Sequence, residues 1–309
     1  MTFTDKDIEV EIPERLFPLY RKANRITFGI LEILLSTINR FSVERGAEGA
    51  ASTAFFTVFA IFPLLIVIVA IGSYFIDGAQ LKNQIIQIVE FAIPVYRDFV
   101  FTNIERVFNQ REAVGIVALL SLAWSANGMF TTFIRNINRA WPKAKMRNFF
   151  QGRAMGFLLI GALFAMLVIA SVTTTFLSLV SRFSTPLFGT DISSIIPGWH
   201  TLTNSIPIII EMIIFMILYY WLPNIKVRWR AAFLAAIIAT LAWQISNRAF
   251  AWYLGSGLDN FSLIYGSLGT IVVLMLWIYI NYLIVYFCAH LSASIGHQMD
   301  KRDIARNAT

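Results

Sequence analysis

The chain offers few side chains that could carry catalytic or metal chemistry. Its three histidines, His200, His290 and His297, form no cluster with cysteines or carboxylates at metal-ligand spacing. The single cysteine, Cys288, can make neither an internal disulfide nor a Cys-x-x-Cys pair. The sequence also lacks a phosphate-binding Walker loop and a Gly-x-Ser-x-Gly nucleophile elbow. We therefore expect a protein that is not an enzyme, with no catalytic residues, no bound metal and no cofactor.

Glu211 is the most suggestive polar residue, because it lies inside the apolar segment IIIEMIIFMILYYW. It precedes Pro223, which marks the end of that predicted helix, by twelve residues, or roughly 18 Å at about 1.5 Å per residue. That depth is within the hydrocarbon core of a bilayer, where a carboxylate is costly and should be paired, protonated or turned toward the protein interior. Structural pairing and the handling of a proton or substrate are equally compatible with this position.

Three amides join Glu211 in the candidate intramembrane polar site, namely Gln244, Asn247 and Asn281. Each can hydrogen-bond between helices with a modest gain in stability, so each taken singly could serve packing alone. Pro63 interrupts another apolar run and removes one backbone hydrogen bond, which predicts a kink. Such a kink serves either packing or gating.

Arg248 lies inside the apolar segment LAWQISNRAFAWYLG. It follows Arg230 by eighteen residues, or roughly 27 Å along a helix, which places it near the external boundary of the hydrocarbon core. Its long side chain can reach outward to the interface, and Trp252, four residues on, can stack against the guanidinium. We interpret Arg248 and Trp252 as an interfacial anchor, with a pair between Arg248 and Glu211 as the alternative.

We expect these side chains to lie on transmembrane helices. The chain is 57% hydrophobic and 14% charged, which is more apolar surface than a soluble domain of 309 residues could bury. A helix needs roughly 20 apolar residues to cross a bilayer, and the sequence contains six such runs. The predicted spans cover about residues 51–76, 114–134, 154–181, 205–222, 231–254 and 264–290. The predicted fold class is therefore an all-α, polytopic integral membrane protein with six transmembrane helices.

The cations fall mainly on one side of this topology. Nineteen of the 25 lysines and arginines lie in residues 1–50, 135–153, 223–230 and 291–309. The opposite side holds four in 77–113, one at Arg182 and none in 255–263. The positive-inside rule therefore places both termini in the cytoplasm. The net charge of +7 is explained by cations that keep loops in the cytoplasm and contact anionic lipid head groups. We therefore expect membrane lipids as partners and no nucleic acid. The sequence leaves the oligomeric state open.

The remaining segments flank or connect the spans. Residues 1–50 form a basic cytoplasmic segment, in which 26–38 is too short to cross and predicts a helix lying in the membrane interface. Residues 77–113 repeat apolar side chains at helical spacing on both sides of Pro94, which predicts an external amphipathic helical hairpin. We expect a single six-helix membrane domain over 51–290, followed by a cytoplasmic tail over 291–309.

Four blocks of the sequence resemble those of one bacterial family. They are AFFTVFAIFPLLIV, NINRAWPKAK, LYYWLPNIKVRWRAAFLAAIIATLAWQISNRAFAWYL and LIYGSLGTIVVLMLWIYINYLIVYFCAHLSAS. In this order they are similar to the YihY/BrkB family of bacterial inner-membrane proteins over about residues 45–296, which implies a six-helix protein of the inner membrane. Members carry the older name ribonuclease BN, generally regarded as mistaken, and virulence-factor labels. Where they commonly end the sixth helix with Gly-Ala-Glu, this chain has Cys288, Ala289 and His290.

Two classes of function fit these features. The first is a transporter or flippase-like protein that moves a lipid or an amphiphilic envelope substrate through an interior lined by Glu211, Gln244, Asn247 and Asn281. Roles in envelope or lipid transport have been proposed for the family that the chain resembles, without a settled substrate. The second is a non-catalytic scaffold that organises the envelope. A ribonuclease is not expected, because the sequence holds no arrangement of residues that would cleave RNA.

Overall fold

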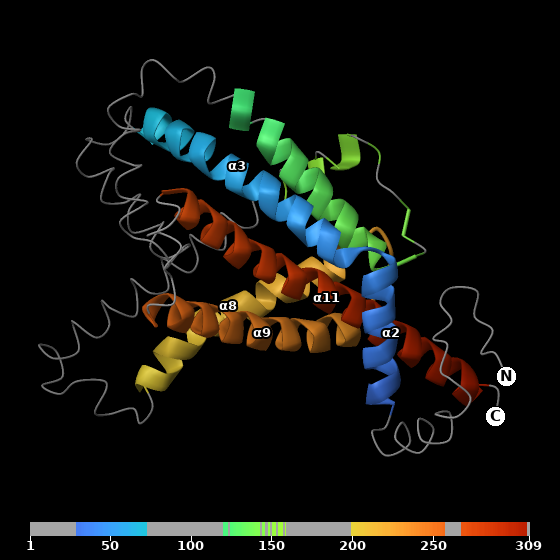
Figure 1. The fold of residues 1–309 in the computed structure, drawn as a ribbon. Coiled ribbons are helices and arrows are strands. Elements are labelled where there is room, and N and C mark those ends of the chain that lie inside the picture. Colours follow the sequence, from blue (N-terminus) through green and yellow to red (C-terminus); the bar gives the residue numbers. More distant parts are fainter. Residues whose placement is uncertain are drawn as a thin grey trace, which may run out of the picture. The chain divides into compact units, whose positions relative to one another are not determined.

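The computed structural model describes residues 29–72, 120–158 (except 123, 143, 146, 147, 149, 153 and 157), 199–256 and 267–307. All regular secondary structure in these residues is helical, which confirms the all-α prediction for this part of the chain. The labelled helices in Figure 1 are α2 (Ile30–Val43), α3 (Gly46–Gly72), α8 (Trp199–Trp221), α9 (Trp229–Gly255) and α11 (Ser267–Asn307). Residues 124–139 are also helical.

The chain divides into two compact units whose boundaries fall inside α2, α9 and α11. The first unit comprises Met1–Thr37, Ile137–Leu241 and Cys288–Thr309. The second comprises Ile38–Asn136 and Ala242–Phe287. Each of these three helices therefore contributes one part to the first unit and the other part to the second.

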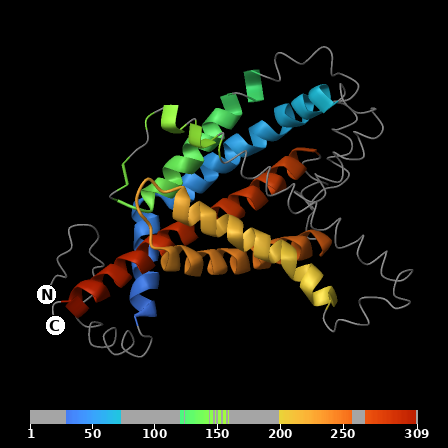
Figure 2. The ribbon, with the colours of Figure 1, turned by 180° about the vertical axis from the view of Figure 1, so that it is seen from behind.

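The second unit has an apolar core built from α3, α9 and α11. Its buried residues on α3 and on α11 follow helical spacing, as one apolar face of a helix requires. They are Ala54, Val58, Phe250, Val273, Leu274, Trp277 and Ile278. The segment 124–136 runs beside α3, as Figures 1 and 2 show, and Phe56 packs edge-on against Trp124 with 5.8 Å between ring centroids.

Two glycines allow α3 and the segment 124–136 to approach closely. A Cβ atom on Gly49 would lie 2.6 Å from Oδ1 of Asn136, and one on Gly128 would lie 2.5 Å from the ring of Phe56. Both distances are too short for a real carbon atom, so these positions have room only for glycine unless the facing side chain moves. Small residues at helix contacts are the usual means by which membrane helices come into close contact.

The first unit packs the start of α9 against the C-terminal part of α11. Ala231, Leu291 and Ile295 form its described core cluster, and Ile33 from α2 and Met299 pack against it. The face of α9 that is buried here consists of Thr240 and five alanines, and the alanines allow close helix packing. They are Ala231, Ala232, Ala235, Ala236 and Ala239.

The described helices agree in part with the predicted spans. Two of them, Trp229–Gly255 and Ile271–Arg306, are long and apolar enough to cross a membrane, and Gly46–Ile61 and Ser205–Trp221 are shorter apolar helices. Most of the predicted span 154–181 and all of the predicted external hairpin 77–113 lie outside the described residues. The six-span topology therefore stays a prediction.

Two helices have bounds that differ from the sequence prediction. The helix expected over 26–38 is described from Ile30 and ends at Val43. The last helix continues to Asn307, well past the predicted span end at 290, and is 41 residues long. Hydropathy falls after residue 290, but that part of the sequence holds no proline and many good helix formers, so the backbone continues as a helix.

Candidate functional site

Two pairs of hydroxyl groups join α3 to α11 inside the second unit. Thr53 Oγ1 lies 2.7 Å from the Tyr286 hydroxyl, and Thr57 Oγ1 lies 3.0 Å from the Tyr282 hydroxyl. The two threonines are four residues apart and therefore lie on one face of α3, and the two tyrosines, also four residues apart, lie on one face of α11. We call these four residues the threonine–tyrosine pairs.

The direction of these hydrogen bonds follows from the threonines. Thr53 Oγ1 donates to the carbonyl of Gly49 at 2.8 Å, and Thr57 Oγ1 donates to the carbonyl of Thr53 at 2.7 Å. A hydroxyl group has one hydrogen, so each threonine can only accept from its tyrosine. The Tyr282 and Tyr286 hydroxyls are therefore the donors, and each threonine hydroxyl both donates and accepts.

One further aromatic ring lies beside the tyrosines of the threonine–tyrosine pairs. The Phe133 ring centroid lies 5.9 Å from those of both Tyr282 and Tyr286. The side chain of Asn136 also interacts with the Tyr286 hydroxyl. Because Thr53 and Tyr286 are fully buried, their hydrogen bonds replace contacts that water would otherwise supply.

A second polar group in this unit connects two of the predicted site residues through Trp277. The indole Nε1 of Trp277 donates to Oδ1 of Asn247 at 3.2 Å. Nδ2 of Asn281 donates to the backbone carbonyl of Trp277 at 2.9 Å. We call Asn247, Trp277 and Asn281 the amide network. In the described part of the chain, Oδ1 of Asn281 is buried and has no hydrogen-bond partner.

The other two predicted site residues lie elsewhere on the helices. Gln244 is half-buried on α9, in the same unit as the amide network. Glu211 lies on α8 in the first unit, where its side chain is half-buried and one carboxylate oxygen is fully covered. The structure thus brings Asn247 and Asn281 together through Trp277 and places Glu211 in the other unit.

The predicted anchor and the predicted kink lie on exposed or partly exposed positions. Arg248 and Trp252 are both exposed on α9, as expected of residues that meet a membrane interface. The described guanidinium that lies over an indole is that of Arg230, 5.5 Å from the Trp229 ring. Pro63 is half-buried within α3, which continues through it. The roles in anchoring and gating stay predictions.

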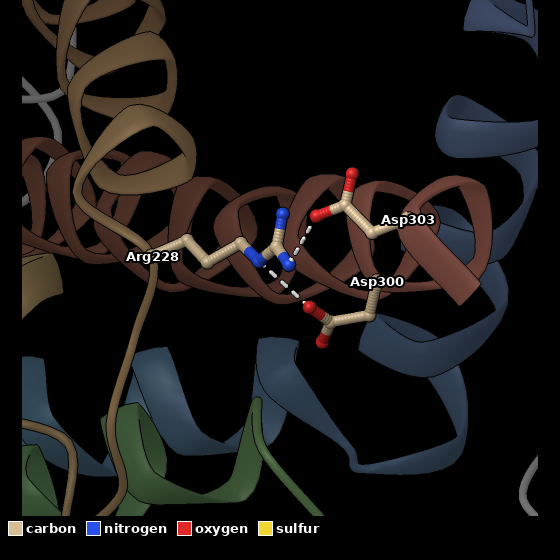
Figure 3. Close-up of polar contacts among 3 residues, drawn as sticks. All are labelled: Arg228, Asp300 and Asp303. Carbon is tan, nitrogen blue, oxygen red and sulfur yellow. Dashed lines mark hydrogen bonds and ion pairs between the residues drawn. The ribbon is translucent and has the colours of Figure 1, made fainter. Parts of the chain in front are cut away.

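A charged cluster that sequence reasoning missed lies where α9 begins. Arg228 Nε lies 2.7 Å from Oδ1 of Asp300, and its Nη2 lies 2.6 Å from Oδ2 of Asp303 (Figure 3). The hydrogen bond to Asp303 is the main reason why the pKa of Arg228 is raised above its ordinary value. One guanidinium therefore fastens the α8–α9 connection to the C-terminal part of α11, since both carboxylates lie one turn apart on that helix.

The same connection is held at a second point. The backbone nitrogen of Asn224 donates to Oδ1 of Asn138, and Nδ2 of Asn224 donates to the carbonyl of Lys145, both at 2.9 Å. These bonds and the Arg228 cluster are structural contacts of the α8–α9 connection. Within the described part of the chain, no group of three or more His, Cys, Asp or Glu residues could hold a metal ion.

The comparison with known proteins decides the family. The family model described as Virulence factor BrkB matches residues 37–309. The chain belongs to the BrkB family. The threonine–tyrosine pairs, the amide network and the Arg228 cluster all lie within the matched residues of this BrkB-family protein.

Several relatives support the membrane assignment of this BrkB-family protein. A UPF0761 membrane protein of Pseudoalteromonas translucida is 30% identical over 271 residues, which is 84% of each chain. A UPF0761 membrane protein of Alteromonas mediterranea is 29% identical, covering 86% of this chain and 88% of that protein. A protein of Bacillus subtilis named as ribonuclease-like is 24% identical over 85% of this chain and 94% of its own. No solved structure matches the chain.

One sequence signal could have found the threonine–tyrosine pairs. Thr53 and Thr57 have the same four-residue spacing as Tyr282 and Tyr286, and both pairs lie within predicted spans. A repeat of hydroxyl groups on one face of two membrane helices predicts hydrogen bonds between those helices. Trp277 carried no comparable signal, because tryptophan is common in membrane helices for packing alone.

Proposed function

We propose that this BrkB-family membrane protein is a transporter or flippase-like handler of a lipid or another amphiphilic envelope substrate. The amide network carries the proposal. Asn247, Trp277 and Asn281 place polar atoms among the core residues of apolar helices, where polar groups are costly and are commonly retained for function. A protein that only needed to pack its helices would not need an amide carbonyl buried without a hydrogen-bond partner.

The proposal includes a location and a topology. The protein crosses the bacterial inner membrane six times with both termini in the cytoplasm, as the distribution of lysines and arginines favours. Helix α2 lies in the cytoplasmic interface, since Ile30, Leu34 and Ile38 repeat at four-residue spacing and are exposed. Its partners are membrane lipids, it binds no nucleic acid, and it acts without an enzymatic step or a cofactor.

A scaffold is the second candidate, and two specific observations favour it. The threonine–tyrosine pairs join two helices, and the Arg228 cluster joins the α8–α9 connection to α11, with distances of 2.6 to 3.0 Å that are typical of well-formed contacts. Contacts of this kind suit a rigid bundle that organises other envelope components. Transport would require the amide network to be reachable by a substrate, whereas a scaffold would not.

A reconstitution experiment tests transport. The full-length protein is placed in liposomes that contain a trace of fluorescent phosphatidylglycerol, and dithionite is added to quench the outer leaflet. We expect quenching to exceed the outer-leaflet half that protein-free liposomes show. Asn247→Leu should reduce the excess, because it removes the acceptor that orients Trp277. Quenching equal to that of protein-free liposomes would contradict the transport proposal and leave the scaffold.

A further inference from the structure

We propose that Lys145, Lys226 and Arg230 form a binding site for the head group of an anionic phospholipid beside the α8–α9 connection. The inference rests on the proposed function, because it names the class of lipid and the residues for the partnership with membrane lipids. All three side chains are exposed. Within the described residues, none of the three forms an ion pair with a carboxylate. We call these residues the unpaired cations.

The backbone that carries the unpaired cations is held in place at two points. Nδ2 of Asn224 donates to the carbonyl of Lys145 at 2.9 Å, which holds the backbone of Lys145 against the connection two residues before Lys226. The Arg228 cluster fastens the same connection to α11 (Figure 3). A backbone that is already ordered reduces the entropy lost when a head group binds.

Arg228 differs from the unpaired cations because its charge is already neutralised. Its guanidinium contacts Asp300 at 2.7 Å and Asp303 at 2.6 Å. Lys301 and Arg302 lie between these two aspartates in the sequence, so this turn of α11 and Arg228 together carry three cations and two carboxylates. The aspartates therefore leave no excess negative charge that would attract the unpaired cations.

No carboxylate in the adjacent sequence competes for the unpaired cations. Residues 137–158 and 222–241, which contain all three of them, hold no aspartate and no glutamate. Each cation attracts an anion most strongly where no carboxylate of the protein already neutralises it. Charge complementarity therefore selects an anionic partner from outside the chain.

Aromatic residues at both ends of the connection select a lipid rather than a soluble anion. Helix α8 ends with Tyr220 and Trp221, which are 49% and 44% exposed, and α9 begins with Trp229, which is 56% exposed. Exposed tyrosine and tryptophan are typical of the membrane–water interface, the level at which lipid head groups lie. A phospholipid can contact these rings with its apolar part while its phosphate contacts the cations, whereas a soluble phosphate ion has no apolar part.

Arg230 keeps its hydrogen-bond donors available while it contacts Trp229. Its guanidinium carbon lies over the Trp229 ring, 5.5 Å from the ring centroid. A guanidinium that stacks on an aromatic ring uses its face, and its N–H groups point outward in its own plane. These N–H groups match the oxygens of a phosphate. The Trp229 ring thus orients Arg230 toward a ligand at the start of α9.

Competition between two lipids tests the inference. Phosphatidylglycerol has one net negative charge, whereas phosphatidylcholine has none and carries an ammonium group that the unpaired cations repel. The full-length protein is equilibrated with equal amounts of both lipids bearing the same acyl chains, and the bound lipids are counted by native mass spectrometry. We expect the unaltered protein to favour phosphatidylglycerol.

Substitutions assign that preference to the unpaired cations. Lys145→Gln, Lys226→Gln and Arg230→Gln should each lower the preference about fivefold, the factor that corresponds to one cation near a membrane surface. Arg230→Lys keeps the charge and should retain the preference. The unfolding temperatures of these variants should match that of the unaltered protein, because the three side chains are exposed.

Arg45→Gln is the matched control. It also removes one exposed cation, but Arg45 is paired with Glu48 at 3.5 Å. We expect it to leave the lipid preference unchanged.

Two results would overturn the inference. One is equal binding of both lipids to the unaltered protein. The other is a loss of preference in Arg45→Gln as large as in Lys226→Gln and Arg230→Gln, since the net charge alone would then set the preference. The two proposals fail separately: a preference that depends on the unpaired cations without translocation in liposomes would refute transport alone, and translocation without that preference would refute the lipid site alone.

Discussion

The Thr53 hydroxyl lies 2.7 Å from the Tyr286 hydroxyl, although 233 positions separate the two residues in the sequence. The first long helix of the second unit is thus hydrogen-bonded to its last one. Thr57 and Tyr282 repeat the contact one turn later in α3 and one turn earlier in α11. In each contact the tyrosine donates, because the threonine hydrogen is already used by its own helix.

Removing either member of the Thr53–Tyr286 pair should destabilise the protein. Thr53→Val and Tyr286→Phe each delete one hydroxyl, and we expect each to lower the free energy of unfolding by about 1 kcal/mol, within the range found for buried hydrogen bonds. The double variant should cost less than the sum of the two single variants, because both remove the same bond. Thermal unfolding in one detergent measures the stability of the two single variants and of the double variant. If the losses in the single variants add up to the loss in the double variant, the hydrogen bond between Thr53 and Tyr286 contributes nothing.

Glycine substitutions should distinguish close helix contacts from open positions. Gly49→Ala and Gly128→Ala should destabilise the protein, since a methyl group would meet Asn136 or the Phe56 ring at 2.6 Å or less. Gly152→Ala is the matched control, because nothing lies within 4 Å of a Cβ there, and alanine favours a helix by about 1 kcal/mol over glycine. We expect lower unfolding temperatures for the first two and an equal or higher one for the third. The reverse order would contradict the described packing.

Arg228→Gln should loosen the contact between the α8–α9 connection and α11. One guanidinium contacts both Asp300 and Asp303, so Arg228→Lys should rescue only part of the loss, because lysine cannot reproduce a two-pronged contact. The pKa of Arg228 is higher in the folded protein than in the unfolded chain, so the charged guanidinium stabilises the fold at every pH below the unfolded-state pKa. This stabilisation is lost only as the pH rises through the folded-state pKa. We therefore expect no change in the stability that Arg228 contributes near neutral pH.

An exposed ion pair elsewhere in the chain supplies the control for Arg228. Arg45 and Glu48 lie 3.5 Å apart, with about 70% of each side chain exposed, and such pairs stabilise proteins by about 1 kcal/mol at most. Hydrogen exchange of residues 222–228 should rise in Arg228→Gln and stay unchanged in Arg45→Gln. Equal exchange in both variants would show that the Arg228 cluster does not hold the connection.

Glu211→Gln tests whether the carboxylate on α8 takes part in transport. If Glu211 handles a proton or substrate, the variant should slow lipid translocation in liposomes while keeping the elution profile and unfolding temperature of the unaltered protein. If Glu211 only forms a structural pair, the variant should lower stability and leave the translocation rate per folded molecule unchanged. The two measurements together separate these roles.

The interfacial position of α2 is tested by a spin label at residue 34. Cys288 is the single cysteine and is buried, so Leu34→Cys in a Cys288→Ser background gives one reactive thiol. We expect high accessibility to oxygen and low accessibility to a water-soluble nickel complex, as for a side chain in lipid. Lys301→Cys, on the exposed part of α11, should show the opposite pattern. Matching patterns at both positions would contradict an interfacial α2.

Hydropathy predicted the helices well where a charge or a glycine bounds an apolar run. The predicted span 231–254 corresponds to α9 (Trp229–Gly255), which Arg230 and Gly255 delimit. The same method could not locate the end of α11, because a helix can continue in polar sequence after its apolar part ends.

The polar contacts were harder to predict than the helices. Asn247 and Asn281 were identified because amides stand out in apolar runs, but their connection through Trp277 depends on how two helices are rotated against each other. The Arg228 cluster joins Arg228 to Asp303, which lies 75 positions later in the sequence. The positive-inside rule already accounts for an arginine in this connection, so its charge alone did not indicate an ion pair. Such contacts depend on tertiary packing, which hydropathy does not specify.

A structure of the full-length protein in lipid nanodiscs, combined with mass spectrometry of the bound molecules, would show whether the protein binds an amphiphilic substrate. We predict an elongated density for an amphiphile bound among the membrane helices, and the mass of that amphiphile in the spectrum. Membrane helices without density for a bound molecule, and no amphiphile in the mass spectrum, would contradict a substrate-handling role and favour a scaffold.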